Sequence, residues 1–206
     1  LQVDYVHPVR ADIQTELRKF EYHVIHYMGH GDFDEDLGGM LLLEKEDGSP
    51  DRISGVDFAN LIRDERLLQL VFLNACKTAT TSMRTGVHPF AGIATTLIEE
   101  GVPAVVAMQF PISDQAAIDF AQTFYQCIAE NRPVDFAVAE GRKALLGSTK
   151  SEWATPVLYL RSENGALFTP VQPTDRRQKK RGWSIERIVL VGLLLLISFF
   201  ISIAIF

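Results

Sequence analysis

Two short apolar runs constrain the fold of this chain more than any other feature. Residues 67–73 read LLQLVFL, and residues 103–108 read PAVVAM. Nearly continuous runs of this length are typical of parallel strands that are buried on both faces. A segment suited to an amphipathic helix lies between them, with Pro89 placed to start it. Strand and helix signals alternate in this way over residues 1–170, and this pattern predicts an α/β domain with a mostly parallel sheet.

The remaining periodicity gives a coarse map of the same domain. Ser54 is placed to cap a helix that runs to about Arg63. A turn at residues 46–50 predicts a hairpin between residues 39–44 and residues 52–53. Further strands are expected at residues 22–28, 153–160 and 166–168, and further helices at residues 11–20, 89–100, 114–130 and 135–146.

The charge divides the chain into two unlike parts. Residues 1–170 carry 14 basic and 24 acidic side chains, a net charge of −10, whereas residues 171–206 carry 6 basic and 2 acidic side chains, a net charge of +4. An acidic domain without a dominant basic face is not expected to bind nucleic acid. Neither a phosphate-binding loop nor a dinucleotide fingerprint is present, so we expect no cofactor and no metal.

The last 19 residues, 188–206, carry no charge. As a helix they would span about 28 Å, close to the thickness of a bilayer core. We therefore predict a transmembrane helix over residues 183–206 after a basic juxtamembrane linker at residues 170–182. The basic flank predicts a single-pass protein of the cell membrane whose folded domain, residues 1–169, is cytoplasmic. A buried core helix is the alternative for the apolar run, and the basic residues are either a topology signal or a binding site for lipid.

Two reactive residue types follow the expected strands directly. His30 follows residues 22–28 within Gly29-His30-Gly31, and Cys76 follows residues 67–73. Adjacent parallel strands would bring these ends to the same edge of the sheet. An imidazole there can take the proton of a thiol, and the N–H groups of Gly31 and Cys76 can form an oxyanion hole. The alternatives are a small core cysteine and a structural turn at the histidine.

Several longer segments make the pattern specific. They read HVIHYMGHG, LVFLNACKTA, PFAGIATTLIEEGVPAVVAMQFPISDQAAIDFAQTFYQ, NRPVDFAVAEGRKALL and EWATPVLYLR. Together these segments resemble the CHAT domain, a caspase-like peptidase domain often found beside tetratricopeptide (TPR) repeats. The resemblance covers about 140 of the 206 residues, in the order of the family.

The resemblance implies a caspase-like three-layer sandwich and a cysteine endopeptidase related to caspases and separases. The catalytic histidine of the family matches His30, and its catalytic cysteine matches Cys76. The chain departs from the caspase signature at Asn74, Lys77 and Thr78, so caspase specificity for aspartate is not expected. Such domains normally have a strand and a helix ahead of the position of residue 1, and the sequence is therefore interpreted as a fragment. A sensor or repeat module, upstream or in a partner, is also implied.

Asp114 is a candidate for substrate selection. It follows the strand that ends near Gln109, where related separase-like enzymes place an acid for a basic substrate residue. The acidic domain would also attract a basic peptide. The alternative is that Ser113 and Asp114 cap the next helix.

Two other functions compete with proteolysis. One is a catalytically silent scaffold or signalling module, held at the membrane by contact of its C-terminal helix with lipid. The other makes the C-terminal segment an effector that oligomerises and permeabilises the membrane while the domain acts as a sensor. The resemblance to the CHAT domain also implies a role in stress or defence signalling. The expected partners of the main hypothesis are a protein or peptide substrate, the membrane and a TPR-like module.

Overall fold

The computed structural model describes residues 2–75, 89–146, 151–168 and 187–192 of the chain. In these residues a central sheet has the strand order β1-β9-β2-β6-β7-β8. The strands are β1 (Gln2–Val6), β2 (Val24–Gly29), β6 (Leu70–Ala75), β7 (Ala104–Met108), β8 (Pro156–Leu160) and β9 (Arg187–Gly192). All neighbouring pairs are parallel except β7 with β8. The prediction of an α/β domain with a mostly parallel sheet is confirmed.

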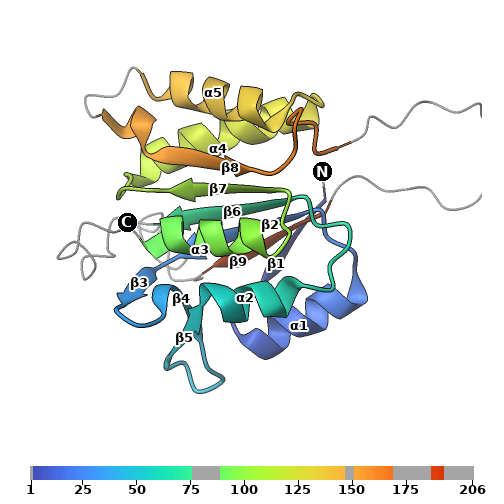
Figure 1. Cartoon of the computed structure of the whole chain (residues 1–206), viewed down its shortest axis with the longest axis vertical. Coiled ribbons are helices and arrows are strands. Elements are labelled where there is room, and N and C mark those ends of the chain that lie inside the picture. Colours follow the sequence, from blue (N-terminus) through green and yellow to red (C-terminus); the bar gives the residue numbers. More distant parts are fainter. Residues whose placement is uncertain (1, 76–88, 147–150, 169–186, 193–206) are drawn as a thin grey trace, which may run out of the picture.

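Helices cover both faces of this sheet (Figure 1). On one side lie α1 (Arg10–Lys19), α2 (Gly55–Ile62) and α3 (Pro89–Glu99), and on the other lie α4 (Asp114–Ala129) and α5 (Val134–Ala144). Successive side chains of a strand point to opposite faces, so neighbouring residues reach different layers. On β2, Tyr27 packs edge-on against Phe90 of α3, with ring centroids 6.1 Å apart. On β6, Phe72 packs against Phe124 of α4 at 5.4 Å.

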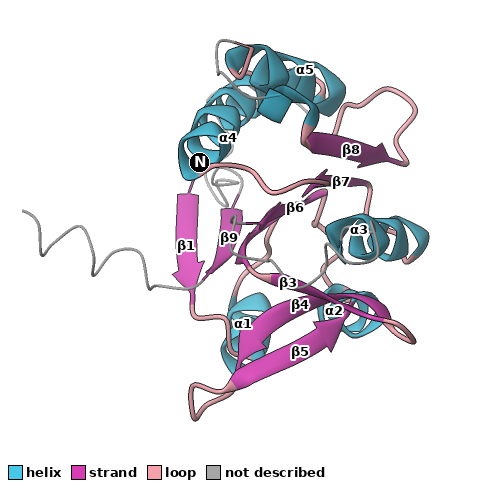
Figure 2. Ribbon diagram, turned by 90° about the vertical axis from the view of Figure 1, so that its left-hand side faces the viewer, coloured by secondary structure: helices cyan, strands magenta, loops and turns pink. Residues whose placement is uncertain are grey.

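A second, smaller antiparallel sheet has the order β3-β4-β5. Its strands are β3 (Gly31–Asp34), β4 (Gly38–Glu44) and β5 (Pro50–Ser54), and they stand apart from the central sheet on the side of α1 and α2 (Figure 2). The predicted hairpin is β4–β5. We did not predict β3, because residues 31–34 combine glycine with acidic side chains, which are rare in strands.

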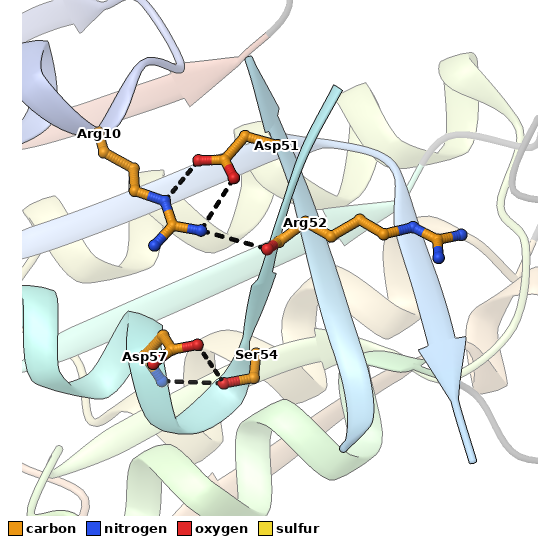
Figure 3. Close-up of polar contacts among 5 residues, drawn as sticks. All are labelled: Arg10, Asp51, Arg52, Ser54 and Asp57. Carbon is orange, nitrogen blue, oxygen red and sulfur yellow. Dashed lines mark hydrogen bonds and ion pairs between the residues drawn. The ribbon is translucent and has the colours of Figure 1, made fainter. Parts of the chain in front are cut away.

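Polar contacts fasten this small sheet to its neighbours (Figure 3). The Arg10 guanidinium donates to both carboxylate oxygens of Asp51 and to the Arg52 carbonyl group. Ser54 is the N-cap of α2, and its hydroxyl oxygen accepts a hydrogen bond from the Asp57 N–H at 3.1 Å. The predicted cap is therefore confirmed, and so is the start of α3 at Pro89.

The structure does not support the predicted transmembrane helix over residues 183–206. Residues 187–192 form β9, a parallel strand between β1 and β2 in which Ile188 pairs with Val3 and Val24. A strand with two parallel neighbours is itself a continuous apolar run, so composition does not distinguish it from a membrane helix. Among the described residues no helix combines the length and apolar character needed to cross a membrane. The rest of the predicted span, residues 183–186 and 193–206, lies outside the described residues, as does most of the predicted linker.

Two smaller differences concern the ends of the domain. Strand β1 was not predicted, because its sequence QVDYV is only five residues long and has a charged residue in the middle. Residues 166–168 were predicted as a closing strand but form a loop. The Val134 N–H in α5 donates to the Gly165 carbonyl group at 2.9 Å, so this loop is fixed to a helix rather than to the sheet.

Candidate active site

The carboxyl ends of β2 and β6 lie side by side at one edge of the central sheet. These strands are parallel neighbours, and their register pairs Met28 with Asn74 and Gly29 with Ala75. His30 is the next residue after Gly29, and Cys76 is the next residue after Ala75. Cys76 itself lies outside the described residues. What the structure shows is that the residues directly before His30 and Cys76 are paired on adjacent parallel strands.

His30 is half-buried and is held through its main chain. Its carbonyl oxygen accepts a hydrogen bond from the Leu42 N–H of β4 at 3.0 Å. The Tyr27 hydroxyl lies 2.8 Å from the same carbonyl oxygen and 2.8 Å from the Leu42 carbonyl oxygen. These contacts connect the end of β2 to the small sheet and fix the backbone from which the imidazole extends.

Gly31, the predicted oxyanion-hole residue, is buried at the start of β3 and pairs with Leu41. The bond from the Leu42 N–H to the His30 carbonyl makes this a pair of the non-hydrogen-bonded type. In such a pair the two N–H groups point away from the partner strand. A Cβ atom on Gly31 would lie 2.7 Å from Cε1 of Phe90, so the position has room for glycine alone.

The residue that follows Gly31 in β3, Asp32, has a buried carboxylate whose contacts are structural. Asp32 accepts a hydrogen bond from the Arg52 guanidinium of β5, and its Oδ1 accepts another from the Phe33 N–H at 2.8 Å. Arg52 is the residue whose side chain points away from Arg10 in Figure 3. Its positive charge balances the acid beside the candidate site.

Asp114 lies at the same edge of the sheet, beyond the carboxyl end of β7. It is the exposed first residue of α4. The preceding residue, Ser113, is the N-cap of this helix, but its hydroxyl makes no capping bond and donates instead to Glu152 at 2.9 Å. The Ser113 N–H also donates to Glu152, at 2.8 Å. Asp114 is thus held on a fixed helix start, with its carboxylate accessible to a ligand.

The histidine that lies within β2, at position 26, is unsuited to proton transfer. His26 is 4% exposed, its ring lies 4.3 Å from that of Phe72, and its Nδ1 is 3.1 Å from the Tyr125 hydroxyl. Burial lowers the pKa of His26 to about 3 and raises the pKa of Tyr125 above its ordinary value. A neutral, enclosed imidazole of this kind supports packing and does not exchange protons with a substrate at neutral pH.

The described cysteine and Asn74 complete the inventory. Cys127 is buried within α4, and burial raises the pKa of its thiol, with Glu130 and Glu140 adding to the effect. It is a poor nucleophile for that reason. Asn74 is buried two residues before Cys76, and among the described residues its Oδ1 has no hydrogen-bond partner. In the described parts of the chain, His, Cys, Asp and Glu side chains form no group of three suited to a metal ion.

The sequence reasoning missed Tyr27, whose hydroxyl contacts the His30 main chain. The available signal was a tyrosine in the strand that leads into Gly29-His30-Gly31. Its side chain is on the face of that strand opposite to His26. One of its two partners, Leu42, belongs to β4, which is adjacent only in space, so the sequence could not show what the hydroxyl binds.

The comparison with known proteins agrees with this architecture. The sequence model of the CHAT domain matches residues 9–184, which is most of the chain. No curated protein gives a significant match. A match of this extent, together with the parallel sheet and the paired strand ends before His30 and Cys76, shows that the chain belongs to the CHAT domain family.

Proposed function

We propose that this protein is a cysteine endopeptidase that uses a Cys76–His30 dyad. The observation that carries the proposal is the register of β2 and β6, which pairs Gly29 with Ala75. If this register continued by one residue, it would bring His30 opposite Cys76 at the spacing of neighbouring strands, roughly 4.8 Å. The caspase-like character of the CHAT domain family supports the same reaction.

The proposed reaction follows from the chemistry of the two side chains. His30 accepts the proton of the Cys76 thiol, and the thiolate attacks the carbonyl carbon of the peptide. The N–H groups of Gly31 and Cys76 stabilise the negative oxygen of the tetrahedral intermediate. His30 then gives its proton to the leaving amine, and a thioester remains on Cys76. Water, deprotonated by His30, hydrolyses the thioester and restores the thiol.

The first test is proteolysis of a fluorogenic peptide library by the full chain. Cys76→Ala is expected to abolish cleavage without a change in circular dichroism. Cys127→Ala removes the other thiol of the chain and is expected to retain cleavage, because that side chain is packed inside α4. Cleavage that survives in Cys76→Ala contradicts the dyad.

The alternative is a catalytically silent module that keeps the fold. An electrophilic peptide probe distinguishes the two. A dyad predicts pH-dependent labelling of Cys76 that is strongly reduced in His30→Ala. Labelling that is equally slow in both proteins, with the pH profile of a free thiol, favours the silent module.

We further propose that Asp114 selects a basic side chain beside the cleaved bond. Its exposed carboxylate on a fixed helix start, at the edge that carries His30, supports this assignment. Asp114→Asn is expected to raise KM about tenfold for peptides with Arg or Lys at that position, the scale of one charged hydrogen bond. Asp119→Asn, on the same helix, is the matched control. A library preference for acidic or apolar residues rules the assignment out.

Membrane anchoring through residues 183–206 is a separate proposal, with the peptidase domain on the cytoplasmic side. The uncharged run and its basic flank support it. It competes with β9 for residues 187–192, since one segment cannot form both structures at once. Leu195→Lys with Ile201→Lys adds charges beyond β9 and is expected to abolish liposome flotation of the full chain. Flotation that persists in this variant excludes the span, and dye release from the same vesicles tests the permeabilising effector.

Regulation by a sensor module, for example TPR repeats upstream or in a partner, follows from the family resemblance. An unregulated cytoplasmic peptidase would damage its cell, so low basal activity is expected from the purified chain. Full activity without any added component contradicts this proposal.

A further inference from the structure

Tyr27 lies on β2, three residues before His30, and its hydroxyl contacts the main chain of the candidate site. Its hydroxyl lies 2.8 Å from the His30 carbonyl oxygen and 2.8 Å from the Leu42 carbonyl oxygen. A phenol has one proton, so it donates to one of these carbonyl groups at a time and links the two. The ring is 1% exposed and packs edge-on against Phe90 of α3. The hydroxyl is therefore delivered by a rigid, fully packed side chain.

The His30 carbonyl group receives two donors from different parts of the fold. One is the Leu42 N–H of β4 at 3.0 Å, and the other is the Tyr27 hydroxyl of β2. A side chain can be aimed only as precisely as the backbone that carries it. Two hydrogen bonds to the main chain of His30 therefore restrict the direction in which its imidazole leaves the strand.

The spacing of Tyr27, Gly29 and His30 makes this contact possible. Residues 27 and 29 lie on the same face of β2, because side chains alternate along a strand. A Cβ atom at position 29 would lie 2.5 Å from the Tyr27 hydroxyl oxygen and 2.7 Å from Cζ. Gly29 thus leaves the space through which the tyrosine reaches the carbonyl group of the next residue.

We propose that Tyr27 is a positioning residue for the catalytic histidine. It does not touch the substrate; it holds the main chain of His30 and so fixes the direction in which the imidazole leaves the strand, which the proposed reaction requires. The inference rests on the proposed peptidase function and deepens it. It predicts that loss of one hydroxyl group, without loss of ring packing, weakens the activation of the thiol.

The test is the rate at which iodoacetamide alkylates Cys76 in the full chain, followed by mass spectrometry from pH 5 to pH 9. In Tyr27→Phe the rate at pH 6.5 is expected to fall about fivefold, the effect of losing one neutral hydrogen bond, and the profile shifts toward that of an ordinary thiol. The matched control is Tyr22→Phe, which removes a buried hydroxyl 3.3 Å from Asp4 and is expected to leave the profile unchanged. On a peptide selected from the library, Tyr27→Phe lowers kcat at constant KM.

A second variant repeats the test with the tyrosine kept. Gly29→Ala is expected to push the hydroxyl away from the His30 carbonyl group and to give the same shift. A wild-type profile in both Tyr27→Phe and Gly29→Ala, with the profile of His30→Ala displaced, overturns the positioning role and leaves the dyad standing. A His30→Ala profile identical to wild type overturns the proposed function, and the role of Tyr27 with it.

Discussion

At the scale of single residues, burial distinguishes His26, which lies within β2, from His30, which follows the end of that strand. His26 is enclosed by Phe72 and Tyr125, and the described parts of the chain offer its Nε2 no hydrogen-bond partner. Its charged form would be shielded from water, which explains why burial lowers its pKa to about 3. His30, four residues later, is half-buried at the edge of the sheet. Burial therefore removes His26 from contact with a substrate, whereas the side chain of His30 remains partly accessible.

The burial of His26 predicts a pH-dependent stability. Because the folded pKa is below the unfolded value of about 6.5, protonation favours the unfolded chain, and stability falls as pH drops below about 6.5. Between pH 8 and pH 5 the expected loss from this residue is about 2 kcal/mol. Urea unfolding at both pH values measures it.

His26→Phe is expected to remove most of this pH dependence. His23, whose pKa burial also lowers, contributes in the same direction, so His23→Gln is the comparison that isolates the share of His26. An equal slope against pH in wild type and in His26→Phe contradicts the prediction.

Gly31 gives a prediction based on space. A Cβ atom there would lie 2.7 Å from Cε1 of the fully buried Phe90 ring. Gly31→Ala is expected to cost about 1–3 kcal/mol in the free energy of unfolding, as other overpacked sites do, and to reduce peptide cleavage. Gly92→Ala is the control, since its Cβ meets its nearest neighbour, the Gly39 nitrogen, at 3.6 Å. Equal stability of the two variants would show that Phe90 can move aside.

At the scale of elements, short polar contacts set where the small sheet ends and α2 begins. Ser54 closes β5 and caps α2, with its oxygen accepting from the Asp57 N–H. The Ser54 hydroxyl in turn donates to the Asp57 carboxylate at 2.8 Å. These reciprocal bonds satisfy groups that a free helix start leaves unpaired.

Ser54→Ala is expected to lower the free energy of unfolding by about 1 kcal/mol, the usual effect of losing an N-cap. Ser54→Gly is expected to cost a few tenths of that amount, because glycine is tolerated at N-caps. Chemical denaturation of both variants measures the difference. Equal losses in the two proteins would mean that the hydroxyl bonds contribute little.

The elements also show what sequence patterns can and cannot predict. Ser54 and Pro89 begin helices as expected, and residues 70–75 and 104–108 form buried strands, because these signals are local. Strand β3 was missed, since its stability comes from pairing with β4 rather than from its own acidic sequence. The partner of Tyr27 was missed for the same reason, because Leu42 is adjacent only after folding.

At the scale of the whole molecule, β9 decides how the sheet is closed. It is the parallel neighbour of both β1 and β2. In the described structure β1 is connected to the sheet through β9, so removal of β9 leaves without partners the backbone groups of β1 and β2 that pair with it, while β2 keeps its pairing with β6.

Hydrogen exchange tests this arrangement. In the full chain, the amides of Gln2–Val6 and of Val24–Gly29 that pair with β9, which are alternate residues in each strand, are expected to be protected. Truncation after residue 182 is expected to raise their exchange by at least tenfold, because unpaired strands exchange at lower opening free energies. Strands β6 and β7 serve as the internal control. Unchanged protection of β1 after truncation would show that β9 does not hold it.

The sequence alone determined the class of fold, its buried strands, its helix starts and the residues that carry the proposed chemistry. All of these depend on local patterns of polarity and on residue types with specific reactivity. Only the tertiary structure decided that Gly29 pairs with Ala75, that Tyr27 reaches the His30 carbonyl group, and that an apolar run forms a strand between β1 and β2. The two strand pairings join segments that are far apart in the sequence, and the Tyr27 hydroxyl also bonds to Leu42 of β4. A polar group bonds to whichever partner the folded chain brings near it, so the local sequence does not specify that partner.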